Sequence, residues 1–142
     1  MKFAYCIFYV PDVSASLAFF NRAFGLPTRF LHESGTYGEL ETGATALAFA
    51  AHELGEMNFS GGHVEAHSSA RPLGMEIGLV CADVHAAHQR ALDAGASELS
   101  APSEKPWGRR YPMCAAPTAC WWSCAQRCRP SPAGQACLRW HP

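Results

Sequence analysis

The residues of this chain that could do chemistry gather in a few places, and the densest is "CAAPTACWWSCAQRC", residues 114–128. It holds four of the seven cysteines and two adjacent tryptophans. Zinc ribbons place cysteines in two close pairs, separated by about a dozen residues or more. Here the cysteines are spaced by six, four and four residues, and an odd total of seven does not suit a disulfide framework. The stretch matches neither kind of cysteine site.

A second group of metal-binding residue types lies in "HVEAH", which contributes His63, Glu65 and His67. Such side chains could bind a divalent metal if the backbone aligned them. They fall within residues 55–72, a stretch rich in Gly, His and Ser that is typical of a linker. Because no helix is predicted to align the two histidines, we expect a solvated loop rather than a ligand set.

Glu76 is the third candidate, because it is a carboxylate inside the apolar run "MEIGLVC". A buried carboxylate either finds a hydrogen-bond partner or has its pKa raised, which would suit proton abstraction. His85 and His88 share a predicted helix face, and we interpret both as surface histidines. Trp107 in "KPWG" could close over a flat ligand or pack under its own loop.

The hydrophobic pattern predicts the elements that position these residues. "KFAYCIFYV" is a short apolar run that predicts a buried strand. A helix is predicted over "VSASLAFFNRAFG", with Asp12 or Ser14 as its cap, one apolar stripe and an end at Gly25. Three short strands are predicted in "TRFLHES", "YGELETG" and "TALAFAAHEL".

The same order of elements begins again after the linker. "MEIGLVCADVHAAHQRALDAGA" predicts a strand, an Asp cap and a helix, at an offset of 71 residues that places Asp83 on Asp12. Self-similarity at a fixed offset indicates two copies of one supersecondary unit. We therefore predict an α+β protein of paired βαβββ modules, with a first module at 1–54, a linker at 55–72 and a partial second module at 73–108.

Charge and composition exclude some classes of partner. The net charge is −1, yet residues 1–104 hold all twelve acids and five Lys or Arg, a balance of −7. The six later basic residues are interleaved with Pro, Cys and Trp, so we expect no nucleic-acid partner. No apolar run approaches a membrane span, and no signal-peptide cleavage site is evident. Only Cys6 and Cys81 precede the cysteine-rich stretch, so we expect a cytoplasmic protein without a membrane partner.

The ordered set "FYVPDVSASLAFFNRAFGL", "YGELETGATALAFAAHEL", "MEIGLVCADVHAAHQRALDAGA" and "KPWG" resembles the vicinal oxygen chelate superfamily. That group includes glyoxalase I, bleomycin-resistance proteins and extradiol dioxygenases. The match covers residues 1–108 in order, including the internal repeat. The resemblance implies paired βαβββ modules whose curled sheets surround a cup, which is often completed in a homodimer.

Catalytic members of that superfamily hold a divalent metal on residues of the first and last strands of each module. By position, the resemblance places three of these sites on Tyr5, near Ala48 and on Glu76, where glyoxalase I has histidine, glutamate and histidine. The fourth would be a glutamate near the C-terminus, but no Asp or Glu follows Glu104. Zn²⁺ or Mg²⁺ needs two or three N or O donors, and a tyrosine phenol with a pKa of about 10 is a poor one. We expect no tightly held metal, while weak binding of a divalent metal stays open.

Two functions remain open at this point. The first is a bleomycin-resistance type of protein that binds a small organic molecule in its cup without a tightly held metal, with Tyr5, Ala48 and Trp107 as ligand-binding residues. The alternative is a metal-assisted lyase or isomerase of glyoxalase I type, with Glu76 as the catalytic base. Glu76 itself has two interpretations, a carboxylate paired with Tyr5 across the pseudo-twofold axis or a group that contacts the substrate.

Residues 109–142 interrupt the resemblance where the second module needs two closing strands. The codons behind "YPMCAAPTACWWSCAQR" can be read in another frame as S-Y-V-R-C-P-D-G-M-L-V-E-L-C-A-A-V, which is a strand, an Asp-Gly turn and a strand. We infer a frameshift near Gly108 or Arg109 and expect an irregular, helical or disordered tail that leaves the second module incomplete. An ordered hairpin in the tail would count against the frameshift.

Overall fold

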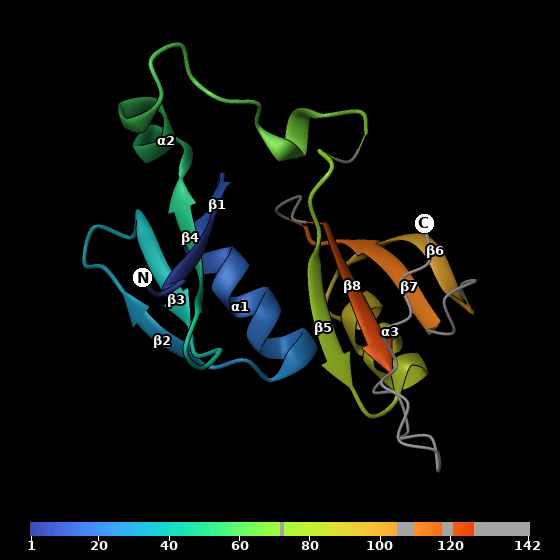
Figure 1. Cartoon of the computed structure of the whole chain (residues 1–142). Coiled ribbons are helices and arrows are strands. Elements are labelled where there is room, and N and C mark those ends of the chain that lie inside the picture. The colour runs from blue at the N-terminus through green and yellow to red at the C-terminus, as the bar shows by residue number, and fades with distance from the viewer. Residues whose placement is uncertain (72, 105–109, 118–120, 127–142) are drawn as a thin grey trace.

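The computed structural model describes residues 1–71, 73–104, 110–117 and 121–126. Two modules with the same order of elements follow one another along the chain (Figure 1). The first comprises β1 (Tyr5–Val10), α1 (Val13–Phe24), β2 (Thr28–Leu31), β3 (Tyr37–Leu40) and β4 (Ala46–Ala51). The second comprises β5 (Ile77–Cys81), α3 (Val84–Asp93), β6 (Ser97–Glu104), β7 (Arg110–Ala115) and β8 (Trp121–Gln126). The sheet orders β1-β4-β3-β2 and β5-β8-β7-β6 match, so the predicted α+β fold of paired βαβββ modules is confirmed.

Both long helices begin at an aspartate, as the repeat predicts. The Asp12 carboxylate accepts a hydrogen bond from the Ala15 backbone N–H at 2.8 Å, and Asp83 accepts one from Ala86 at 3.0 Å. Each cap satisfies one of the four N–H groups that a helix start leaves unpaired. Helix α1 ends at Gly25, whose φ of 67° is a left-handed conformation that glycine adopts without strain.

One hydrophobic core continues through both modules. The apolar stripe of α1 covers one face of the first sheet, where the rings of Phe20 and Phe49 lie 5.3 Å apart. Helix α1 also contacts α3, so the buried residues Ala87 and Ala91 of α3 join the same core. The helices therefore cover one face of each sheet, and the other face of the first sheet is left for a site. Among the described residues, no helix combines the length and apolar character needed to cross a bilayer.

The second sheet is complete. Strand β7 pairs antiparallel with β6 and β8, with Met113 opposite Ser123, and β8 pairs parallel with β5. The expectation of an irregular tail and an incomplete module is therefore wrong over 110–115 and 121–126. This outcome counts against a frameshift near Gly108, and the nucleotide sequence of the gene is the direct test.

The reason for this correction is that strand pairing is made by the backbone. Without β7 and β8, strands β5 and β6 would present rows of unpaired N–H and C=O groups, which any extended segment within reach can satisfy. Pro112 cannot donate to a ladder, and it falls where the β6–β7 register is irregular, between the pairs formed by Met113 and Tyr111. The later part of the tail, residues 127–142, lies outside the described residues.

The segment between the modules is more ordered than a linker. Strand β4 ends at Ala51, and the residues "HEL", predicted as its continuation, begin α2 (His52–Asn58). A 3-10 helix, η1 (Ala66–Ser68), follows. The segment folds back on β1, because the Asn58 side-chain amide donates to the Tyr9 hydroxyl at 3.1 Å.

Candidate binding site on the first sheet

The face of the first sheet opposite α1 carries the candidate site. Phe49 of β4 and Leu40 of β3 are buried on the side of α1, and side chains alternate along a strand, so their sequence neighbours point to the other face. We call this face, opposite α1, the open face. Its members include Tyr5, Ile7, Tyr9, Tyr37, Glu39 and Ala48.

Glu39 is the most constrained polar residue of the open face. Its carboxylate accepts a hydrogen bond from the Tyr37 hydroxyl at 3.0 Å, and the Arg29 guanidinium lies 3.7 Å away. Its side chain is 12% exposed. Burial and the adjacent carboxylate raise the pKa of Tyr37 to about 12, so the phenol remains a hydrogen-bond donor at neutral pH. The pair offers a ligand one carboxylate acceptor beside a neutral hydroxyl.

Glu39 was not predicted from the sequence, because the resemblance places the corresponding glutamate on the neighbouring strand, at Ala48. Ala48 lies opposite Ile7 of β1 and opposite Glu39 of β3, so the three share one row across the sheet. Ala48 itself is fully buried. A carboxylate is thus present one strand away from the position where the resemblance places a glutamate. The signal for Glu39 was the alternation in "YGEL", which puts Tyr37 and Glu39 on one face.

Tyr5 and Glu76 occupy related places in the two modules. Tyr5 begins β1 on the open face and is half exposed. Glu76 immediately precedes β5 and is also exposed. It shares its alternation with Gly78 and Val80, which are the exposed residues of β5. That both side chains serve one ligand stays a prediction, and Trp107 lies outside the described residues.

His88 is not the surface residue that was predicted. It is 7% exposed, its Nε2 lies 2.6 Å from the Glu98 carboxylate, and its Nδ1 lies 3.4 Å from the Cys114 sulfur. Strands β6 and β7 pack over this side of α3, which no helix periodicity could indicate. Burial raises the pKa of Cys114 to about 11, so this cysteine is a protonated core residue. His85, in contrast, is exposed as predicted.

The "HVEAH" segment also differs from the solvated loop that was predicted. His63 is half-buried, and Glu65 and His67 approach His52, a residue that sequence reasoning did not single out. Burial lowers the pKa of His52, while Glu65 opposes that change and His63 adds to it. This cluster lies just after the end of β4, where Ala50 pairs with Tyr37 of β3.

Comparison with known proteins decides the family. A sequence model of the glyoxalase/bleomycin resistance protein/dioxygenase superfamily matches residues 2–123. The chain belongs to this superfamily. The match extends beyond residue 108, where the resemblance in the sequence stopped. No curated protein matches the chain.

Solved structures of this superfamily share the fold. A glyoxalase/bleomycin resistance protein/dioxygenase family enzyme from Burkholderia phytofirmans is 21% identical, with a TM-score of 0.73 over 89% of this chain and 98% of that one. A glyoxalase-related enzyme from Fulvimarina pelagi is 20% identical, with a TM-score of 0.75 over 89% of this chain and 88% of that one. At this identity the likeness concerns the fold alone.

Proposed function

We propose that this superfamily member binds a small organic molecule against the open face, within a cup that holds no tightly bound metal. The observation that carries the proposal is the set of residues at the positions that hold metal in catalytic members. Those positions have Tyr5, Ala48 and Glu76, and the chain has no acid after Glu104 to supply the fourth. One carboxylate and one neutral phenol are too few donors to fix a divalent ion. Capture of a ligand, as in bleomycin-resistance proteins, needs no such ion.

The chemistry of the open face suits a ligand with a flat apolar part and at least one hydrogen-bond donor. Tyr5 and Tyr37 present aromatic surface on this face, in the strands that flank β4. The Glu39 carboxylate can accept a hydrogen bond that orients the ligand. Few polar groups on a mostly apolar face are typical of small-molecule sites.

A cytoplasmic homodimer is the second part of the proposal. Tyr5 and Ile7 of β1 and Val80 of β5 are 50%, 44% and 60% exposed. A second copy of the chain could cover these side chains and complete the cup. Sedimentation of the purified protein measures the assembly directly, and a monomer at all concentrations contradicts this part.

The test of the ligand site uses metal-free bleomycin and a panel of planar aromatic antibiotics as probes, with calorimetry as the readout. We expect at least one probe to bind, with unchanged affinity in the presence of a chelator. The variants Tyr5→Ala and Glu39→Gln should weaken it about tenfold, which is about 1.4 kcal/mol of binding free energy. Glu33→Gln, at an exposed glutamate outside the strands, is the matched control and should bind as the natural protein does.

Two outcomes contradict the proposal. One is that no probe binds, or that probes bind equally to both site variants. The other is turnover of a glutathione hemithioacetal after Ni²⁺ or Zn²⁺ is added, lost in Glu76→Gln, which would establish a metal-assisted lyase instead.

A further inference from the structure

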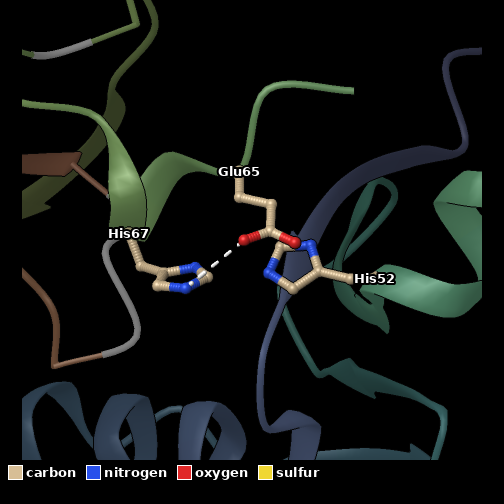
Figure 2. Close-up of side chains that lie close together, drawn as sticks. All are labelled: His52, Glu65 and His67. Carbon is tan, nitrogen blue, oxygen red and sulfur yellow. Dashed lines mark ion pairs between the residues drawn. The ribbon is translucent and has the colours of Figure 1, made fainter. Parts of the chain in front are cut away.

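Three metal-ligating side chains meet where β4 ends and the segment between the modules returns (Figure 2). His52 is the first residue of α2, Glu65 precedes η1, and His67 lies within η1. One ligand atom of each lies within 4.8 Å of the others, and the His67 Nε2 is 3.4 Å from a Glu65 carboxylate oxygen. Donors bound tetrahedrally at zinc distances are about 3.3 Å apart. The Glu65–His67 pair is already close to this spacing. Both side chains are partly exposed, so they can rotate to bring their ligand atoms closer to His52.

The orientation of His52 points to a missing partner. Its Nδ1 lies 2.9 Å from the Nε2 of His63, so that nitrogen is engaged. Its Nε2 is buried and has no hydrogen-bond partner among the described residues. Buried polar atoms in native structures are rarely left unpaired, and an unpaired one requires an explanation such as a bound ion. Metal-ligating histidines use their second nitrogen for a hydrogen bond that fixes the ring, and His63 is placed to supply it.

His63 is itself held tightly. Its ring centroid lies 5.0 Å from that of Tyr9, and it packs directly against Gly55 of α2. A Cβ at Gly55 would lie 2.6 Å from the His63 Cε1 atom, so only glycine leaves space for the ring. Glycine within a helix is unfavourable compared with alanine. Its presence here is explained by the need to seat His63 behind His52.

We propose that His52, Glu65 and His67 bind a divalent transition-metal cation of the zinc class, with His63 as the positioning residue behind His52. Two imidazoles and one carboxylate suit Zn²⁺, Co²⁺ or Ni²⁺ better than Mg²⁺ or Ca²⁺, which prefer oxygen ligands. Three protein ligands leave a fourth position for water or another small ligand. A bound cation would tie η1 to the end of β4. The site uses none of the side chains proposed to bind the ligand, but it adjoins the open face through Tyr9, which contacts His63.

The test is titration of the full, reduced protein with Co²⁺ and Zn²⁺, followed by visible absorption and by competition with a chromophoric chelator. We expect one cation to bind with a Co²⁺ spectrum of nitrogen and oxygen ligation. Glu65→Gln and His67→Gln should each weaken binding by about 100-fold or more, because loss of even an orienting residue lowers metal affinity about 10–100-fold. His63→Gln should weaken binding by about 10–100-fold, because His63 orients His52 and does not bind the cation itself. An excess of Mg²⁺ should leave the Co²⁺ spectrum unchanged.

The cysteines of the tail could also bind Co²⁺ or Zn²⁺. The Glu65 and His67 variants separate the two possibilities, because they should weaken binding only at the proposed site. His85→Gln on α3 and Glu33→Gln are exposed controls that should bind as the natural protein does. Glu65 and His67 are partly exposed, so their variants should keep the natural circular dichroism spectrum. The proposal is overturned if these variants bind Zn²⁺ as tightly as the natural protein, if sulfur-to-cobalt charge transfer dominates the spectrum, or if no cation binds.

Discussion

Replacement of Gly38 by alanine tests how closely α1 approaches the sheet that carries the open face. A Cβ at Gly38 would lie 2.7 Å from the Leu17 Cδ1 atom and 3.2 Å from both the Phe30 carbonyl oxygen and the Val13 Cγ1 atom. Leu17 and Val13 are 3% exposed, so neither side chain can turn into solvent to make room. Overpacking of this kind costs about 1–3 kcal/mol, because the helix or the strand must shift.

The assay is thermal unfolding of Gly38→Ala beside the natural protein. A destabilisation of 1 kcal/mol lowers Tm by about 2–4 °C in a domain near this size, so a fall of roughly 2–12 °C is expected. The shift should also disturb the Tyr37–Glu39 hydrogen bond, because Gly38 lies between these two residues in β3. The last part of the tyrosine absorbance titration, near pH 12, should then move to lower pH, since the pKa of Tyr37 is raised by burial and in part by Glu39.

Gly78→Ala is the matched control. Gly78 also lies in a strand, but among the described residues no atom lies within 4 Å of the Cβ that alanine would add. Alanine at an unstrained glycine position stabilises by about 0.4–1 kcal/mol, chiefly by restricting the unfolded chain. The two variants should therefore change Tm in opposite directions. If Gly38→Ala is as stable as Gly78→Ala, the close approach of α1 to β3 is wrong.

Two further predictions concern the second module. The stability that the neutral thiol of Cys114 contributes is fully present below pH 9 and lost as pH rises through about 11, because burial and Glu98 raise its folded pKa from 9.0 to about 11. Urea unfolding at about pH 8 and about pH 10.5 should show a steeper loss for the natural protein than for Cys114→Ala, and equal losses would refute the assignment. Asp83→Ala removes the cap of α3 and should cost about 0.5–2 kcal/mol by the same method. Asp93→Ala, at the other end of α3, should cost little, and equal costs would mean that Asp83 does not act as a cap.

The parts of the fold that follow local rules were predictable from the sequence. Asp12 and Asp83 cap their helices through a backbone N–H only three residues further along the chain. Such a hydrogen bond is local and needs no tertiary contact. Gly25 ends α1 for an equally local reason, since it adopts a left-handed φ without strain. The offset of 71 residues then indicated two equivalent modules. In the candidate site, the family resemblance pointed to Tyr5 and Ala48, and the pairing of β1 with β4 places both on the open face.

What the sequence alone determined is therefore the order of the strands and long helices from β1 to β6, and the resemblance to the family; α2, η1, β7 and β8 were not predicted. Tertiary structure decided which distant residues meet. Glu39 pairs with Arg29 because β2 and β3 are neighbours, and His52 reaches Glu65 and His67 only because the chain reverses after α2. The pairing of β7 with β8 likewise depends on the open edges of β5 and β6 rather than on the side chains of the tail. These contacts join segments that are distant along the chain, and no periodic pattern in the sequence indicates them. They form only once the sheets have assembled.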